Sequence, residues 1–106
     1  MRSKVVVPRA LAVRDVEAAV EHYRDEASEV VALGFVEALQ NGYTHISRHH
    51  PGSGSTRFSH ELNLPGLRSR LLRDYPYIIF YVEREECIDV WRALHGQRDI
   101  PAWLRA

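Results

Sequence analysis

The fold is decided by residues 64–103, which read LPGLRSRLLRDYPYIIFYVEREECIDVWRALHGQRDIPAW. This stretch contains three runs with the two-residue alternation of β-strands, separated by short polar or proline-containing connections. We expect strands at Leu67–Leu72, Tyr75–Val82 and Cys87–Leu94. Because the connections are short, neighbouring strands should run antiparallel and form a β meander.

The same alternation predicts which side chains share a face of this sheet. One face of the middle strand carries Ile78, Phe80 and Val82, and the other carries Tyr75, Tyr77, Ile79 and Tyr81. In the last strand, Ile88, Val90 and Leu94 alternate on one face. We expect helices to cover the purely apolar face. The opposite face, with Arg68, Arg70, the tyrosines and Trp91, should remain open to solvent. Arginine and tyrosine are residue types that anchor protein interfaces.

The N-terminal half predicts one strand and two helices. Lys4–Val7 is a β-branched run stopped by Pro8, which places it near a sheet edge. Apolar residues then recur every three or four positions over Ala10–Ala27, and again from an N-cap at Ser28 to about His49. The second stripe comprises Ala32, Phe35, Leu39, Gly42 and Ile46, widened by Val36 and Tyr43. We expect these two helices to form an antiparallel hairpin.

Gly34, Ala38 and Gly42 form a line of small residues on the second helix. Glycine inside a helix costs about 1 kcal/mol relative to alanine, so the line suggests a closely packed neighbour. We expect this neighbour to be the first helix, with a partner protein as the alternative. After the helix, residues 51–57 form a loop, and Phe58–Leu62 is a weaker candidate strand.

The fold class is therefore α+β, with an N-terminal strand, an antiparallel helical hairpin and a C-terminal antiparallel β meander. The length of 106 residues predicts a single domain over residues 1–106. Lys and Arg together number 14, as do Asp and Glu, and this zero net charge disfavours a protein held on nucleic acid by phosphate neutralisation.

The sequence predicts a cytoplasmic protein without metal or cofactor. Cys87 is the only cysteine, which excludes an intramolecular disulfide and suits a reducing compartment. No apolar run approaches the length of a membrane span. His45 and His49 have the spacing of two helical metal ligands, with His50 beside them, but no third ligand is evident. Histidines at a helix C-terminus are adequately explained by the helix dipole.

Three segments together resemble the RelE/ParE superfamily of type II toxins, and its ParE branch in particular. They are residues 64–68 (LPGLR), 75–81 (YPYIIFY) and 88–101 (IDVWRALHGQRDIP). The expected order of strand, helical hairpin and meander is also that of the superfamily. The resemblance covers nearly the whole chain.

The resemblance implies a small toxin neutralised by a ParD-like antitoxin in a hetero-oligomer, with operator DNA bound only indirectly through the antitoxin. ParE-like members are associated with inhibition of DNA gyrase, and such systems with plasmid stabilization and growth inhibition. RelE-like members are ribosome-dependent mRNA endonucleases, which use lysines, arginines and a C-terminal tyrosine. Here Lys4 is the only lysine and no tyrosine follows Tyr81. We therefore favour a gyrase-binding toxin without enzymatic activity; the alternatives are an mRNA endonuclease and a degenerate, non-toxic antitoxin-binding module.

We expect the antitoxin to contact the outer surface of the helical hairpin and the sheet face near Arg68, Arg70 and Tyr81. The candidate residues for target binding or toxicity are Arg92, His95, Arg98 and Trp103. Each has a structural alternative. Arg92 would pair with Asp89 or Asp99, and Arg98 would pair with Asp99 to cap a turn that starts at Ile100. His95 would be a hydrogen-bonded structural histidine, and Trp103 would plug the open end of the core.

Overall fold

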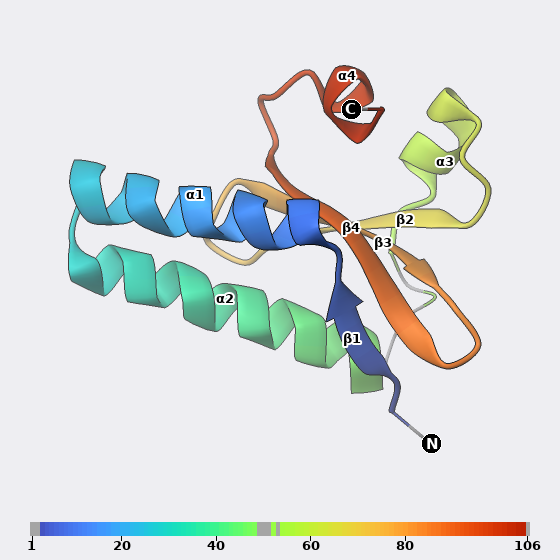
Figure 1. Ribbon diagram of the computed structural model, residues 1–106, viewed down its shortest axis with the longest axis horizontal. Coiled ribbons are helices and arrows are strands. Elements are labelled where there is room, and N and C mark those ends of the chain that lie inside the picture. The colour runs from blue at the N-terminus through green and yellow to red at the C-terminus, as the bar shows by residue number, and fades with distance from the viewer. Residues whose placement is uncertain (1–2, 49–51, 53, 106) are drawn as a thin grey trace.

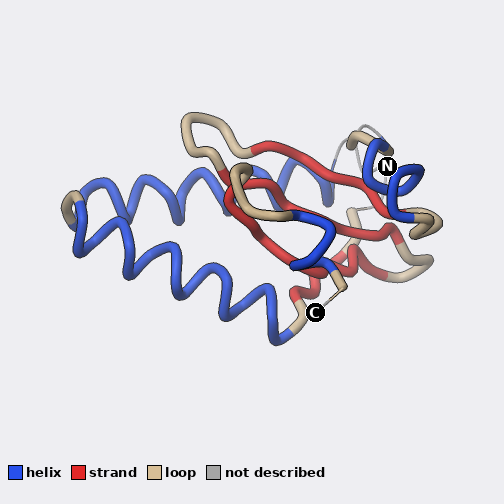
Figure 2. Tube along the Cα trace, turned by 90° about the horizontal axis from the view of Figure 1, so that it is seen from above, coloured by secondary structure: helices blue, strands red, loops and turns tan. Residues whose placement is uncertain are grey.

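The computed structural model describes residues 3–48, 52 and 54–105. Its elements in chain order are β1 (Val5–Pro8), α1 (Ala10–Glu26), α2 (Glu29–Arg48), α3 (Arg57–Leu62), β2 (Leu67–Leu71), β3 (Tyr77–Glu83), β4 (Cys87–His95) and α4 (Ile100–Leu104). The helices α1 and α2 lie side by side as an antiparallel hairpin, whose tip projects beyond the sheet (Figures 1 and 2). The predicted α+β order, hairpin and meander are confirmed.

The four strands form one sheet in the order β1-β4-β3-β2. The pairs β2–β3 and β3–β4 are antiparallel, whereas β1 pairs parallel with β4. β1 is therefore an edge strand, as the proline at its end predicts. The N-cap prediction is confirmed as well, because Ser28 Oγ accepts a hydrogen bond from the backbone N–H of Val31 at 3.2 Å.

Residues 58–62 are helical, so the predicted strand there is wrong. In α3, Phe58 and Leu62 are one helical turn apart, which places both side chains on one face. Leu62 is buried, and the Phe58 ring contacts the Phe80 ring edge-on at 5.3 Å between centroids. A run this short carries no periodicity that separates helix from strand, and packing against the sheet decides between them.

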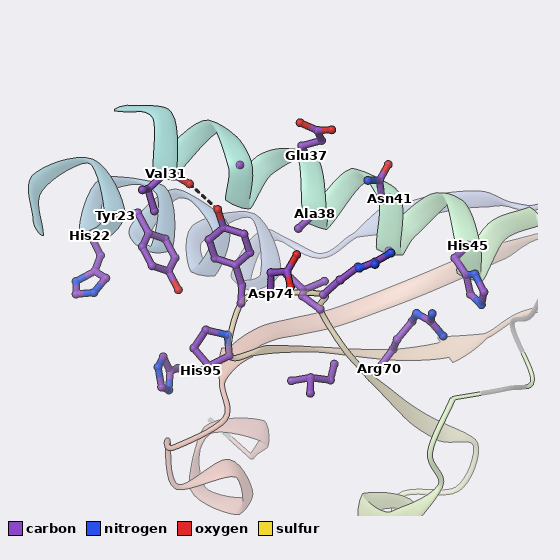
Figure 3. Close-up of a pocket in the computed structure, with 17 residues that line it drawn as sticks. His22, Tyr23, Val31, Glu37, Ala38, Asn41, His45, Arg70, Asp74 and His95 are labelled. Carbon is purple, nitrogen blue, oxygen red and sulfur yellow. Dashed lines mark hydrogen bonds between the residues drawn. The ribbon is translucent and has the colours of Figure 1, made fainter. Parts of the chain in front are cut away.

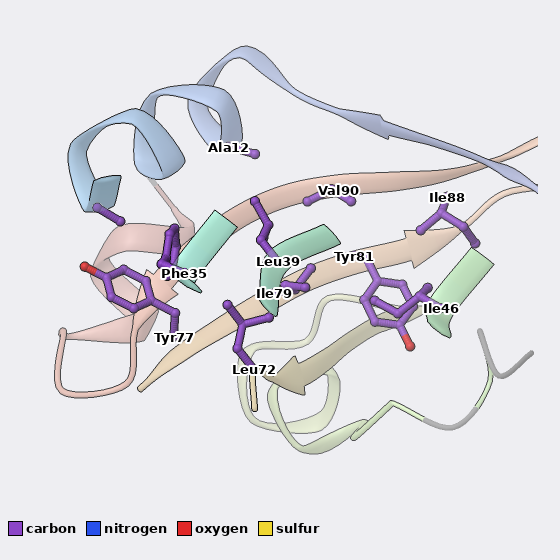
Figure 4. Packing of buried hydrophobic residues seen from close by; sticks show 11 residues of the cluster. Ala12, Phe35, Leu39, Ile46, Leu72, Tyr77, Ile79, Tyr81, Ile88 and Val90 are labelled. Carbon is purple, nitrogen blue, oxygen red and sulfur yellow. The ribbon is translucent and has the colours of Figure 1, made fainter. Parts of the chain in front are cut away.

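Both faces of the sheet are covered, and the faces are assigned opposite to our prediction. The hairpin covers the tyrosine face, where Phe35 and Leu39 pack against Tyr77, Ile79 and Tyr81 (Figure 4). The face with Phe80 is covered instead by α3 and α4. Its buried cluster comprises Leu67, Phe80, Val82, Leu94 and Ile100. The expected open arginine and tyrosine face does not exist, and Tyr81 is 0% exposed.

A β-bulge explains why simple alternation fails in β4. Tyr81 pairs with Val90, and Phe80 pairs with Arg92, so Trp91 is an extra residue on β4. Before the bulge, Val90 faces the hairpin, and after it Leu94 faces α3 and α4. The prediction that Ile88, Val90 and Leu94 share a face is therefore wrong for Leu94.

We predicted that the small residues of α2 would pack against α1. They pack instead against side chains of the sheet and of the segment before β3. A Cβ atom on Gly34 would collide with the Tyr75 hydroxyl, and one on Gly42 would lie 3.1 Å from Ile79 Cδ1. The Tyr75 hydroxyl donates a hydrogen bond to the Val31 carbonyl at 2.9 Å. This close approach holds the segment before β3 against the hairpin.

The collision at Gly34 predicts a specific non-additivity. Gly34→Ala should lower the free energy of unfolding by about 1–3 kcal/mol, because the added methyl group displaces the Tyr75 hydroxyl. In a Tyr75→Phe background the same change should cost little, since the obstructing oxygen is gone and alanine favours a helix by about 1 kcal/mol. A double-mutant cycle by urea unfolding measures this coupling, with Gly52→Ala, which meets no atom within 4 Å, as the control. Additive losses would contradict it.

Candidate functional site

A groove of about 1240 Å³ lies between α2 and the segment that joins β2 to β3 (Figure 3). One wall is α2, with Glu37, Ala38, Asn41 and His45. The other wall is formed by the residues from Arg70 to Pro76. Tyr75 and Ile79 pack beside the two α2 glycines, and Ala38 between these glycines lines the groove.

The β2 side of the groove combines two cations with an apolar side chain. Arg70 and Arg73 line it, and neither forms an ion pair with another described residue. Leu71 between them is 64% exposed. Arg70, one of the three predicted antitoxin-binding residues, thus lies in this groove. Arg73 was not among the predicted site residues. Nothing in the sequence distinguishes a charged residue beside a turn that contacts a partner from one that is only solvated.

Arg68 and Tyr81, the other predicted antitoxin residues, lie elsewhere. Arg68 is half-buried, and its guanidinium donates to the Gly54 carbonyl at 2.9 Å. The buried Tyr81 packs beneath the hairpin. Burial raises the pKa of its hydroxyl, against the opposing effect of the nearby Arg68 charge. Tyr81 therefore offers no accessible surface to a partner.

A second recess, a cleft of about 390 Å³, brings together three of the four predicted toxicity residues. His95, Arg98 and Trp103 all line it, opposite Asp15 and Ala18 of α1. Arg98 stacks on the Trp103 ring, with Cζ 4.4 Å from the ring centroid, instead of pairing with Asp99. The carboxylate of Asp99 accepts from the Ala102 N–H at 3.4 Å and so caps α4, which starts at Ile100 as expected.

Arg92, the fourth predicted toxicity residue, is buried and not available for contact. Its guanidinium binds both carboxylate oxygens of Asp15 at 2.7 Å and also donates to the Trp103 carbonyl at 2.8 Å. The side chains of Arg92 and Asp15 are only 8% and 10% exposed. Hydrogen bonding to Asp15 raises the pKa of Arg92, outweighing the effect of burial.

The partner of Arg92 was not foreseen. We predicted Asp89 or Asp99, whereas the structure pairs Arg92 with Asp15 of α1. Asp89 instead accepts from Arg9 and Arg84 at 2.9 and 3.1 Å. The Asp15–Arg92 pair joins residues that are 77 positions apart in the chain, and no local sequence pattern indicates such a contact.

The environments of His95 and Trp103 match their structural alternatives. His95 packs edge-on against Tyr77, with ring centroids 5.2 Å apart, and its Nδ1 accepts from the Gln97 N–H at 3.1 Å. Trp103 is half-buried against the cluster beneath α4, which supports its role as a plug. His95 and Trp103 nevertheless both line the cleft, so a structural role does not remove either side chain from its surface.

Within the described residues, no three His, Cys, Asp or Glu side chains gather to hold a metal ion. His45 lines the groove, but His49 and His50 lie outside the described residues. Nor does any described helix have the length and apolar character needed to cross a bilayer.

The fold is a small α+β module with two recesses, and sequence comparison identifies the class of protein to which it belongs, the toxins of type II toxin-antitoxin systems. The family model for the ParE toxin of the type II toxin-antitoxin system parDE matches residues 6–100. The chain belongs to this ParE toxin family.

A solved structure supports the fold independently. It belongs to the chromosomal ParDE toxin-antitoxin system from P. aeruginosa, with a TM-score of 0.75 and 18% sequence identity. The match covers 90% of this chain and 98% of that chain. None of the curated proteins compared with the chain matches it.

Proposed function

We propose that the protein is a toxin that inhibits DNA gyrase by binding it and is neutralised by a ParD-like antitoxin. Membership of the ParE family supports this reading. The ParE family match carries the choice of binder over nuclease. Arg70, Arg73 and Arg98 have no ion pair with a described residue, but they are divided between the groove and the cleft, and three other cations are engaged. Arg92 is held by Asp15, Lys4 pairs with Glu83 at 2.9 Å, and Arg68 donates to Gly54. An mRNA endonuclease needs free cations to stabilise charge developing at the phosphate.

The cleft is the proposed contact site for the target. Arg98 and Trp103 are the types of side chain that dominate protein interfaces, and here they are stacked and therefore already ordered. His95 lies beside them. For the antitoxin, we retain Arg70 and the half-buried Arg68 as candidate contacts on β2 and leave out the buried Tyr81.

Charge reversal at Arg98 tests the target site. Arg98→Glu should weaken inhibition of gyrase supercoiling about tenfold or more, because it removes a cationic anchor that lines the cleft. The matched control is Arg105→Glu, an exposed arginine outside both recesses, which should stay within about twofold of the unmodified toxin. Thermal unfolding of both variants checks that the fold is kept.

Two outcomes would contradict the proposal. If antitoxin-free protein cleaves mRNA on ribosomes and leaves supercoiling unchanged, the protein is a nuclease. If its expression without an antitoxin leaves growth unimpaired, it is a non-toxic antitoxin-binding module. Equal effects of the Arg98 and Arg105 substitutions would separately show that the cleft is not the contact site.

A further inference from the structure

The Asp15–Arg92 pair ties three elements together beside the cleft. Asp15 lies on α1 and lines the cleft, and its partner Arg92 lies on β4. The Arg92 guanidinium also reaches α4, where it donates to the Trp103 carbonyl at 2.8 Å. The pair therefore connects the hairpin and the sheet to the short helix that carries Trp103.

Asp15 can take this position because β1 ends early. β1 pairs with β4 only as far as Pro8 opposite Val90, and the chain then turns into α1. The following part of β4 has no strand on its β1 side, and there Asp15 Oδ2 accepts the Ala93 N–H at 3.1 Å. One carboxylate thus satisfies the sheet backbone and also binds the Arg92 guanidinium.

The Arg92 guanidinium holds the last turn of α4. The final carbonyl groups of a helix have no partner within the helix, and a nearby arginine can supply one. Among the described residues, the bond from Arg92 to the Trp103 carbonyl is the only hydrogen bond between α4 and another helix or strand. Arg92 Cζ also lies 5.4 Å from the centroid of the Trp103 ring, on which Arg98 is stacked. The position of this stack therefore depends on Arg92.

We propose that the Asp15–Arg92 pair positions Trp103 and Arg98 for contact with the target. Arg92 is then a positioning residue, which acts on toxicity through α4 and not by touching the target itself. The same role falls to Asp15, whose carboxylate holds the guanidinium in place. This inference rests on the proposed function, because it takes the cleft as the target-contact site.

The first experiment compares amide hydrogen exchange in α3 and α4, the two short helices that cover the same face of the sheet. Arg92→Lys keeps a cation at this position but removes the planar guanidinium that reaches the Trp103 carbonyl. The Trp103 N–H, which donates to the Asp99 carbonyl, should then exchange at least about tenfold faster. The His60 N–H, which donates to the Thr56 carbonyl in α3, should stay within about twofold, whereas a general loss of stability would accelerate both amides.

The second experiment measures inhibition of gyrase supercoiling, which Arg92→Lys should weaken at least about fivefold, because the contact side chains are no longer ordered before binding. The matched control is Arg9→Lys. Arg9 binds Asp89 at 2.9 Å, and its guanidinium lies 4.7 Å from the centroid of the Trp91 ring, but it is outside both recesses. Arg9→Lys should change inhibition by no more than about twofold.

If Arg92→Lys does not fold, Asp15→Leu/Arg92→Met takes its place, since this double variant leaves no buried charge without a partner. Unchanged exchange in α4, or equal changes in α3 and α4, would overturn the positioning role. Faster exchange in α4 with unchanged inhibition would overturn its link to toxicity. The exchange rates do not involve gyrase, so they still test the role of the pair if the unmodified toxin leaves supercoiling unaffected.

Discussion

Asp15→Ala is expected to lower the free energy of unfolding by about 3–5 kcal/mol, the usual cost of leaving one partner of a buried ion pair alone. The substitution leaves the buried Arg92 guanidinium without its carboxylate. It also removes the acceptor of the Ala93 N–H, which donates to Asp15 Oδ2 at 3.1 Å. Because Asp15 joins α1 to β4, the loss should appear in cooperative unfolding by urea, monitored by circular dichroism.

Two control variants separate the buried pair from charge effects in general. Glu61→Ala removes an exposed pair with Arg57, whose atoms are 3.2 Å apart, and should cost less than about 1 kcal/mol. Asp15→Leu/Arg92→Met removes both buried charges and should be less destabilising than Asp15→Ala, since no ion remains uncompensated. If the double variant were the less stable of the two, desolvation of Arg92 would not be the cause.

Phe35→Ala is expected to lower the free energy of unfolding by about 3–5 kcal/mol, the range for a fully buried aromatic side chain. Phe35 is 0% exposed and lies where α2 meets the sheet. Its ring contacts those of Tyr23, Tyr75 and Tyr77 at centroid distances of 5.5, 5.6 and 5.1 Å. The cavity would open beside the groove, so antitoxin affinity should be measured together with stability.

Leu33→Ala is the matched control, because Leu33 is in the same helix and is 68% exposed. Its truncation should change the free energy of unfolding by no more than about 0.5 kcal/mol. Comparable losses for Leu33 and Phe35 would mean that burial does not set the effect. A selective loss at Phe35 would show that the aromatic cluster holds the hairpin on the sheet.

Local sequence patterns predicted the elements of this fold well where the pattern was long. The 3.6-residue stripe from Ala32 to Ile46 corresponds to buried positions of α2, and Ser28 caps that helix. The alternation after Leu67 locates β2, β3 and β4 to within two residues at each end. These features depend on the conformation of neighbouring residues, which the sequence specifies directly.

The candidate site was only partly predictable. The sequence suggested His95, Arg98 and Trp103 as contact residues, and the structure gathers these three side chains in one cleft. The burial of Tyr81 and the pairing of Arg92 with Asp15 were not predicted. The burial of Tyr81 and the partner of Arg92 depend on which face of the sheet the hairpin covers. Both faces carry apolar side chains, so the sequence does not indicate which face that is.

By itself the sequence determined the kinds and order of the longer elements and membership of the ParE toxin family, since each depends on local periodicity or on motif residues near in the chain. Tertiary structure alone decided the face that the hairpin covers, the bulge at Trp91, the Asp15–Arg92 pair and the two neighbouring recesses that share His22 and His95. The physical reason is range. A side chain's burial and partners depend on packing between segments distant in sequence, and one extra residue in β4 reverses the faces of all that follow.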